Sequence, residues 1–197
     1  MRKAGLIAII LLLSSCGAVF ASPIYCPLTG HYYEAISGTY DWNVAKANAE
    51  ALSYGGANGY LAVLTSQAEN DWVWSNLGNP SYYWLGAIQD PNGAEPSGGW
   101  GWVTGETWSW DNWNGGEPND NSSFGYIDDN IQFWTNGKWN DLSGNSSNSI
   151  YGTGSPAGSK YYQGYIVEYA TPEPATLSLL GLGITGLAGF RRKKGIK

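Results

Sequence analysis

Cysteine is scarce in this chain, whose 197 residues include only Cys16 and Cys26. Cys16 lies in an N-terminal stretch that we expect to be removed on export, so the remaining domain is predicted to contain no internal disulfide. Side-chain packing must then stabilise the fold, and eleven tryptophans and fourteen tyrosines supply large aromatic surfaces for it.

Groups that perform acid–base or nucleophilic chemistry are also rare. The one histidine, His31, has no serine or cysteine motif beside it, and no glycine-rich phosphate loop followed by Lys-Ser/Thr occurs. A lone histidine among aromatic residues is more often a packed side chain than a base. Glu117 and Asp128 could be read as a glycosidase pair, but acids are frequent here and chance explains such a pair better. The sequence favours a binding protein over an enzyme.

Basic residues are almost missing from the central part of the chain. Between Ser22 and Pro174 there are sixteen acids and three lysines, a net charge of 3 − 16 = −13, and the lysines are Lys46, Lys138 and Lys160. Such a surface repels phosphate backbones, which argues against a nucleic-acid partner, and it attracts divalent cations.

No apolar run at the N-terminus is long enough to span a bilayer. A basic start precedes the apolar residues 6–13, and small residues follow, which is typical of a secretory signal peptide. We therefore predict a signal peptide over residues 1–21, with cleavage before Ser22. An alternative is a lipoprotein signal, because Leu13 precedes Ser14, Ser15 and Cys16, and Cys16 could then carry the lipid.

Helix signals come early and strand signals late. The apolar residues within 41–53 recur at helical spacing, which predicts a helix with Asp41 as its N-cap. Gly55 is expected to end that helix. Residues 60–64 read as a short buried strand, and a second helix opens at Ser66 with Glu69 completing a capping box. Strands are expected in YYWLGAI, GWGWV, YIDDNIQFW and YQGYIVEYA. This order predicts an α+β domain over residues 22–170.

Two segments between these elements have unusual composition. Residues 90–139 contain little regular pattern but many tryptophans, which predicts a long packed loop rather than a disordered one. The tryptophans of its first half are Trp100, Trp102, Trp108, Trp110 and Trp113. Residues 143–160 are rich in Ser, Gly and Asn and are predicted to be a flexible insertion.

Two short motifs carry hard oxygen donors. Glu117 and Asn119 flank Pro118, and Asn140 with Asp141 follows Trp139 about twenty residues later. Carboxylate and amide oxygens are ligands that Ca²⁺ prefers. The E-P-N and W-N-D pair resembles the sugar-binding Ca²⁺ site of C-type lectin domains. WLGA at residues 84–87 and the closing strand at 165–169 extend the resemblance over most of residues 30–169, which implies the C-type lectin-like fold: two helices, small antiparallel sheets and a long loop region.

The resemblance also implies a ligand set. Glu117, Asn119, Asn140 and Asp141 would hold one Ca²⁺, and two adjacent sugar hydroxyls would complete its shell. Spare polar atoms on Glu117, Asn119 and Asn140 would hydrogen-bond those hydroxyls. The order E-P-N implies mannose-, glucose- or fucose-type sugars. Trp113 is a candidate for stacking on a sugar ring, with packing inside the loop as the alternative.

One expected ligand is missing from this set. Relatives usually carry a further acid before the next strand, where this chain has Phe124 and Gly125. Asp128 or Asp129 could replace it, but neighbouring residues of a strand face opposite sides, so at most one can reach. Ca²⁺ takes six to eight oxygens, so the loss is expected to weaken binding unless water fills the gap.

The C-terminal segment, residues 171–197, is a second signal. Pro172, Glu173 and Pro174 precede an apolar run at residues 175–190 and a basic cluster at 191–194. The segment resembles the PEP-CTERM sorting signal of Gram-negative bacteria, which implies recognition by an exosortase-type enzyme and transient membrane association. A plain membrane anchor is the alternative.

Together these features predict an exported bacterial protein of the cell surface or extracellular matrix. The working hypothesis is Ca²⁺-assisted binding of carbohydrate, such as the producer's exopolysaccharide. The alternative is a lectin-fold interaction module or matrix scaffold that binds neither Ca²⁺ nor sugar.

Overall fold

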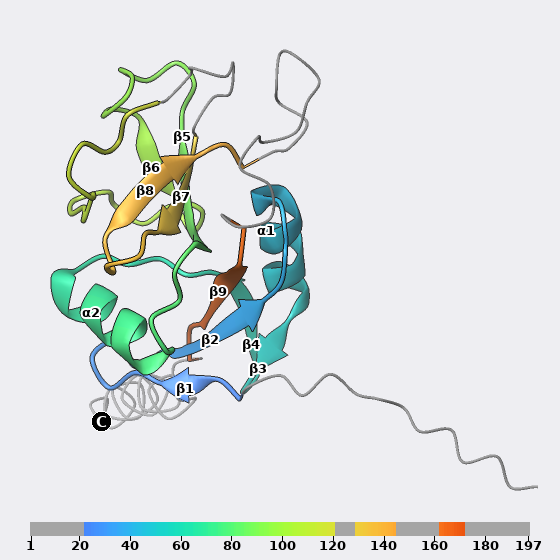
Figure 1. Ribbon diagram of the computed structural model, residues 1–197. Coiled ribbons are helices and arrows are strands. Elements are labelled where there is room, and N and C mark those ends of the chain that lie inside the picture. The colour runs from blue at the N-terminus through green and yellow to red at the C-terminus, as the bar shows by residue number, and fades with distance from the viewer. Residues whose placement is uncertain (1–21, 121–128, 145–161, 172–197) are drawn as a thin grey trace, which may run out of the picture.

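A computed structural model describes residues 22–120, 129–144 and 162–171. Several features singled out in the sequence lie outside these residues. They are the predicted signal peptide, Phe124, Gly125, Asp128, most of the predicted insertion and the C-terminal segment after Thr171. In chain order the described elements are β1 (Ile24–Tyr25), β2 (Tyr32–Ser37), α1 (Trp42–Ala51), β3 (Ser53–Tyr54), β4 (Ala57–Leu61), α2 (Gln67–Asn76), β5 (Tyr83–Gln89), β6 (Trp100–Trp102), β7 (Asn130–Phe133), β8 (Trp139–Leu142) and β9 (Gly164–Tyr169) (Figure 1).

Strand β9 is the centre of the sheet, and all six of its residues are buried. Its antiparallel partner on one side is β2, which pairs with it along its whole length. On the other side β4 pairs with the second half of β9, and β5 pairs with the first half in a parallel sense. The last strand of the chain therefore joins the two halves of the domain, which explains why YQGYIVEYA is so rich in apolar and aromatic residues.

The sheet continues from β5 toward the long loop. Strand β7 pairs antiparallel with β5, β8 with β7, and the short β6 also pairs with β5. At the opposite end, β1 pairs with β2, and β3 pairs with β4. The α+β fold is confirmed, but the strands form one connected mixed sheet rather than separate small antiparallel sheets, because β9 bridges both halves.

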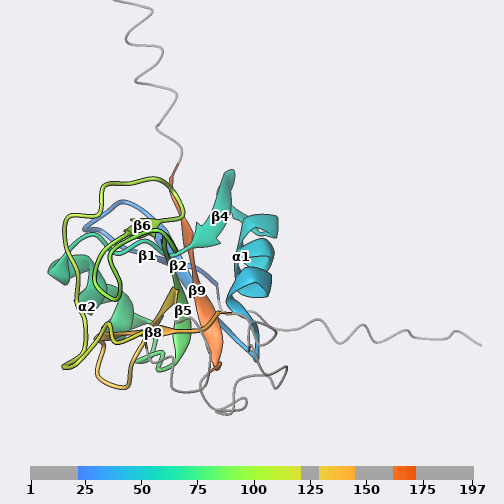
Figure 2. The same cartoon turned by 90° about the horizontal axis from the view of Figure 1, so that it is seen from above.

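Helix α1 covers one side of the sheet, and α2 lies on the other side (Figures 1 and 2). Asp41 is the N-cap of α1, as predicted, and Trp42, Ala45 and Ala49 are buried on its inner face. The small alanines bring the helix close to β4 and β9. The indole of Trp42 donates a 2.8 Å hydrogen bond to the Leu85 carbonyl, which ties α1 to β5.

The capping box predicted at the start of α2 is only half formed. Ser66 accepts a 3.3 Å hydrogen bond from the Glu69 backbone N–H, as expected for an N-cap. The Glu69 carboxylate instead accepts from the Thr65 backbone N–H at 2.8 Å and from the Tyr33 hydroxyl at 2.7 Å. Glu69 is therefore turned inward, and it connects the helix to β2. Among the apolar residues of α2, Val73 is buried and Trp72 is half-buried.

Three boundaries differ from the sequence prediction. Helix α1 ends at Ala51, and Gly55 with Gly56, both at positive φ, forms the turn of the β3–β4 hairpin instead of the helix stop. The strand predicted at residues 60–64 is shifted toward the N-terminus and ends at Leu61. The first two residues of the predicted insertion, Ser143 and Gly144, are held in place because their carbonyls accept hydrogen bonds from Tyr162 and Trp42.

The tryptophan-rich loop folds back over the β6–β8 end of the sheet as a packed cluster. Trp100, Trp102 and Trp139 are buried in it, and the half-buried Trp108, Trp110 and Trp113 pack around them. The ring centroids of Trp102 and Trp108 are 4.7 Å apart, and those of Trp110 and Trp139 are 5.2 Å apart. The predicted packed loop is confirmed. Cys26 is a free, fully buried thiol.

Candidate functional site

The two predicted ligand motifs meet because the long loop pairs with β8. Trp113 forms a parallel β-bridge with Trp139. The Asn114 backbone N–H donates to the Trp139 carbonyl at 2.8 Å, and the Trp139 N–H donates to the Asn112 carbonyl at 2.9 Å. The segment that leads to Glu117 is thus fixed by main-chain hydrogen bonds directly beside the strand that begins W-N-D.

Asp141 is the centre of this region. Its side chain is 2% exposed, and its Oδ2 accepts hydrogen bonds from the backbone N–H groups of Asn119 at 2.9 Å and Asp120 at 2.7 Å. Its Oδ1 is buried and makes no hydrogen bond to any described residue. One carboxylate oxygen therefore holds the loop, and the other lacks a partner, which is costly for a buried polar atom.

The remaining predicted ligands surround this carboxylate. The Glu117–Pro118 peptide bond is cis, and the Asn119 side-chain amide donates to the Glu117 carboxylate. The Asn140 amide donates a 2.7 Å hydrogen bond to the Asp141 carbonyl. Direct hydrogen bonds therefore link Glu117 to Asn119, Asn119 to Asp141 and Asp141 to Asn140. All four predicted ligands come together in one group.

Trp113, the fifth predicted site residue, belongs to the loop packing. Its ring centroid lies 4.9 Å from that of Trp100 and 6.0 Å from that of Trp139. The side chain is half-buried. These contacts favour the packing alternative for Trp113.

Buried amides beneath the site hold the β7–β8 hairpin. Asn70 on α2 donates to the Gly137 carbonyl at 3.0 Å and accepts from the Trp139 indole at 2.8 Å. Asn112 also donates to the Gly137 carbonyl, at 3.1 Å, and accepts from the Lys138 ammonium at 3.1 Å. The positions of Asn140 and Asp141 therefore depend on α2 as well as on the loop.

Two further acids lie close enough to affect the site: Asp129, which the sequence offered as a replacement for the missing ligand, and Glu95, which it did not. Burial is the largest cause that raises the pKa of Asp129, to about 6, and the charges of Glu95 and Asp120 add to it. Burial also raises the pKa of Glu95, with contributions from Asp120 and Asp141. The mutual repulsion of these acids indicates a negative local potential. Glu95 could have been noticed in the sequence, because Glu95–Pro96 repeats the Glu–Pro pair of the first motif and is also cis.

The donor set fits a hard divalent cation but contains few carboxylates. Within residues 22–120, 129–144 and 162–171, no group of three or more His, Cys, Asp or Glu side chains is arranged to hold a metal ion. The group around Asp141 has two carboxylates, and its other donors are the amides of Asn119 and Asn140. The unpartnered Asp141 Oδ1 is the atom that a cation would satisfy. Asp90, an acid at the start of the same long loop, accepts hydrogen bonds from the backbone and side chain of Asn92 in its own turn.

The histidine lies at the other end of the domain, in the turn between β1 and β2. His31 Nδ1 is 2.5 Å from Glu168 Oε1, and Glu168 Oε2 accepts from the Val63 N–H at 2.8 Å. The Tyr33 hydroxyl lies 3.2 Å from the same Glu168 Oε1. The His31 side chain therefore pairs with the buried Glu168 carboxylate and joins the turn before β2 to β9.

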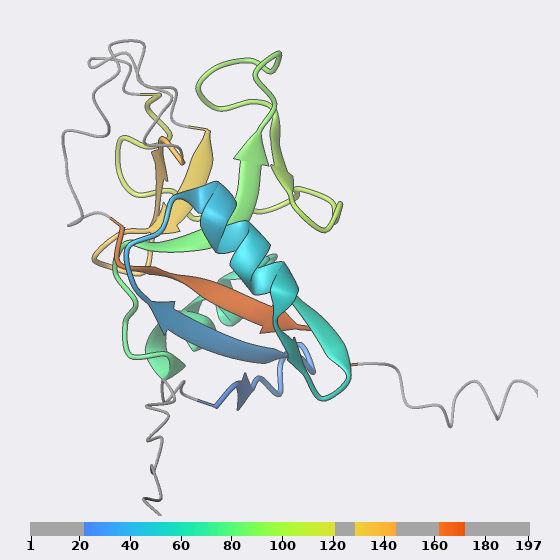
Figure 3. The ribbon, with the colours of Figure 1, turned by 90° about the vertical axis from the view of Figure 1, so that its right-hand side faces the viewer.

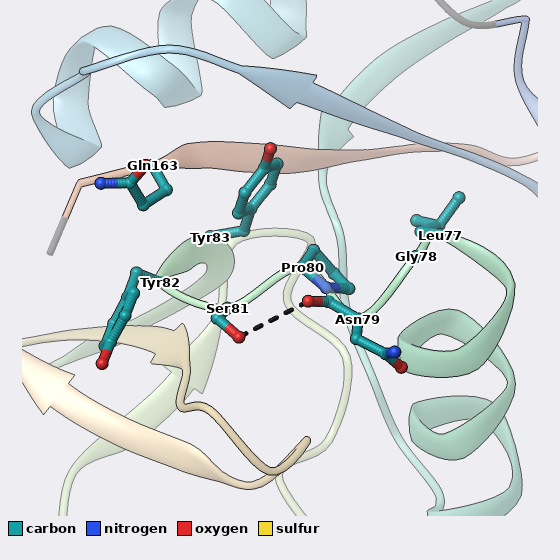
Figure 4. A pocket seen from close by; sticks show the side chains of 8 residues that line it. All are labelled: Leu77, Gly78, Asn79, Pro80, Ser81, Tyr82, Tyr83 and Gln163. Atoms are coloured by element: carbon teal, nitrogen blue, oxygen red, sulfur yellow. Dashed lines mark hydrogen bonds between the residues drawn. The ribbon is translucent and has the colours of Figure 1, made fainter. Parts of the chain in front are cut away.

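A shallow cavity of about 510 Å³ lies beside the loop between α2 and β5 (Figure 4). It is lined by residues 77–83 and Gln163, and the Ser81 hydroxyl is 3.5 Å from the Asn79 carbonyl. No Asp, Glu, Lys, Arg or His lines it, so it offers no charged ligand group.

The sequence comparisons identify the fold family. The model of the lectin C-type domain matches residues 43–150, more than half of the chain. The chain belongs to the C-type lectin domain family. Halomucin from Haloquadratum walsbyi is 35% identical to this lectin domain protein in an alignment 154 residues long. The match covers 71% of this chain but only 1% of that relative's length.

Solved structures support the same fold. The mouse scavenger receptor C-type lectin carbohydrate-recognition domain is 20% identical, with a TM-score of 0.53, over 72% of this chain and 92% of that chain. C-type lectin CEL-I from Cucumaria echinata is 19% identical, with a TM-score of 0.52, over 80% of this chain and 99% of that chain. At these identities the likeness concerns the fold alone.

The C-terminal segment gives a separate match. The model of the PEP-CTERM protein-sorting motif matches residues 170–193, which agrees with the resemblance found in the sequence. Among the described residues, no helix has the length and apolar character needed to cross a membrane.

Proposed function

We propose that this lectin domain protein is exported and binds carbohydrate with the help of Ca²⁺. The proposal rests on the hydrogen bonding of the buried Asp141 carboxylate. Two backbone N–H groups fix one oxygen of its carboxylate, and the other oxygen is buried without a hydrogen-bond partner among the described residues. A bound cation would satisfy that oxygen and reduce the repulsion from Glu95, Asp120 and Asp129.

In this proposal Glu117, Asn119, Asn140 and Asp141 hold the ion. Ca²⁺ would supply a positive charge and open coordination positions for two adjacent sugar hydroxyls. Glu117, Asn119 and Asn140 lie close together, so their remaining polar atoms could hydrogen-bond the same hydroxyls. The partner class is a carbohydrate, with the producer's exopolysaccharide as the working candidate.

The sorting motif supports the location. Its match at residues 170–193 implies export with a C-terminal membrane anchor and processing by an exosortase-type enzyme. We infer that the lectin domain acts at the cell surface or in the extracellular matrix, where polysaccharide is present.

Calorimetry on the chelator-treated protein tests the metal step. We expect Ca²⁺ to bind and to raise the thermal unfolding temperature, and Glu117→Gln to lose most of both effects because the amide is a weaker ligand. Asp111→Asn is the matched control, since Asp111 is an exposed acid of the same loop. Mannose should then bind only with Ca²⁺ present, and galactose should bind more weakly.

The alternative is a scaffold or protein-interaction module without metal or sugar. The observation in its favour is the low number of carboxylates in the group, since no cluster of three acidic, histidine or cysteine ligands occurs in the described part. No Ca²⁺ heat and no thermal stabilisation would favour this alternative. Mannose binding that survives both chelation and Glu117→Gln would contradict the site itself.

A further inference from the structure

Exposed apolar side chains gather at one end of the domain. Six large apolar residues are exposed among the described residues, and four of them lie on β1, in the turn after it, or in the β3–β4 hairpin: Ile24, Tyr25, Leu28 and Tyr54. The rings of Tyr25 and Tyr54 both pack against Tyr32, with centroid distances of 5.2 and 4.9 Å. We call Ile24, Tyr25, Leu28, Tyr32 and Tyr54 the tyrosine edge.

The tyrosine edge is the uncharged part of a strongly acidic domain. Its segments, residues 22–33 and 52–61, contain no Asp, Glu, Lys or Arg, and neither do residues 169–171. Apart from tyrosines and the buried Cys26, the one ionisable side chain of these segments is His31, which is paired with the buried Glu168. The exposed Glu106 of the long loop lies close enough for its charge to act on His31. An anionic lipid surface would repel the acidic faces of this domain, but it can approach this one.

The chain also leaves the domain at this end. Tyr169 pairs with Tyr32 across β2 and β9, and its ring centroid lies 5.8 Å from that of Tyr54. The Thr171 hydroxyl donates a 3.0 Å hydrogen bond to the Gly30 carbonyl, in the turn that contains Leu28. Figure 3 shows β9, in orange, ending beside the β3–β4 hairpin. The exit point is therefore fixed against the tyrosine edge.

The distance to the apolar segment is short. Its apolar run begins at Ala175, four residues after Thr171, so a fully extended chain covers at most about 14 Å between them. The basic cluster at residues 191–194 follows the run. If the run enters a bilayer, the end of the domain that carries Thr171 must lie at its surface.

We propose that the tyrosine edge is a lipid-contact surface that seats the domain on the bilayer from which the C-terminal segment extends. Tyrosine rings favour the headgroup region because they combine an apolar body with a polar hydroxyl, and Leu28 and Ile24 add apolar area that reaches deeper. β1 is a two-residue edge strand, so Ile24 and Tyr25 on its opposite faces can both contact lipid when the edge is presented to the membrane. The candidate sugar site lies at the opposite end and would face away from the lipid (Figure 1).

The test uses the exported protein with its C-terminal segment intact, reconstituted in vesicles of phosphatidylethanolamine with a minor fraction of phosphatidylglycerol. A polarity-sensitive fluorophore is placed by Leu28→Cys, and by Ile88→Cys as a matched control at an exposed aliphatic residue on β5. Both variants also carry Cys26→Ser, which removes the other cysteine of the predicted exported protein. We expect a blue-shifted emission at position 28 and quenching by spin-labelled lipid at least about twofold stronger than at position 88.

A second variant separates lipid contact from mere proximity to the anchor. Tyr25→Asp, added to the labelled Leu28→Cys protein, should reduce the quenching at position 28 and leave the thermal unfolding temperature in detergent unchanged, because Tyr25 is half exposed. Equal quenching at positions 28 and 88 would overturn the proposal. A blue shift that appears in detergent and grows with protein concentration would assign the surface to a second copy. A blue shift caused by polysaccharide without lipid would assign it to glycan.

Discussion

The indole nitrogen of Trp139 donates a 2.8 Å hydrogen bond to the side-chain oxygen of Asn70, and both groups are buried. This bond joins α2 to the strand residue that precedes Asn140 and Asp141. The same Asn70 side chain donates to the Gly137 carbonyl in the β7–β8 turn. Helix α2 therefore positions the predicted ligand pair without contributing a ligand.

Asn70→Ala should destabilise the domain by about 2–4 kcal/mol, because it leaves the buried Trp139 indole N–H unpaired and removes one of two donors to the Gly137 carbonyl. Urea unfolding measures the change. Asn76→Ala on the same helix is the control: Asn76 is exposed, and its effect should stay within about 0.5 kcal/mol. Equal effects of the two substitutions would contradict the role given to Asn70.

The pair of His31 and Glu168 should make stability depend on pH near neutrality. The hydrogen bond to Glu168 raises the pKa of His31 above 6.5, and burial raises the pKa of Glu168. Both folded-state pKa values are raised, so the native state binds more protons than the unfolded state. The His31 contribution is therefore complete below its unfolded pKa of about 6.5 and is lost as the pH rises through the folded value.

Urea unfolding from about pH 6 to about pH 8 checks this expectation. The free energy of unfolding should fall with rising pH, and His31→Gln should flatten the decrease, because glutamine keeps a hydrogen-bond donor but does not titrate. The expected sign would be wrong if the domain became more stable over this range, or if the variant kept the full slope.

Asp129→Asn should stabilise the metal-free domain at neutral pH. Burial and the charges of Glu95 and Asp120 raise the pKa of Asp129 from 3.8 to about 6, so ionisation disfavours the folded state above pH 4. Because Asp129 is only partly buried, solvent screens its charge, and we expect a gain of only about 1 kcal/mol. Unfolding in chelator at pH about 7 and about 4 measures it. The gain should vanish at the lower pH, and an equal gain at both would assign it to packing instead of charge.

Gly86→Ala should be strongly destabilising. A Cβ at this position of β5 would lie 2.2 Å from the Leu61 carbonyl oxygen, and the Gly86 backbone is itself bonded to Ala62 and Val103. The backbone at Gly86 and the backbone at Leu61 cannot move apart without breaking these hydrogen bonds. We therefore expect the free energy of unfolding to fall by about 2–4 kcal/mol. Gly101→Ala in the paired strand is the control, because no atom lies within 4 Å of its added Cβ. The thermal unfolding temperature of Gly86→Ala should be clearly lower than that of Gly101→Ala. Similar temperatures would contradict the close contact between Gly86 and Leu61.

The local elements were predictable because their signals lie within a few residues. Asp41 and Ser66 begin the two helices, and the aromatic and β-branched runs became β5, β7 and β9. The helix stop at Gly55 was wrong, since glycine at positive φ suits a hairpin turn as well as a helix end, and only the pairing of β3 with β4 decides between them.

The candidate site was predictable as a set of residues but not as an arrangement. The Glu117 and Asn140 motifs stand far apart in the chain, and the resemblance to lectin domains paired them. The contribution of Glu95 and the support from Asn70 were missed, because each depends on a contact between elements distant in sequence.

By itself the sequence determined the fold family, the acidic composition of the central residues, the C-terminal sorting motif and the oxygen donors available for a cation, because these depend on composition and short motifs. Only the tertiary structure decided that one Asp141 oxygen holds the loop while the other stays buried without a partner. It also decided that the uncharged tyrosine edge lies where the chain leaves the domain. Both facts follow from long-range strand pairing through β8 and β9, and no local pattern in the sequence encodes such pairing.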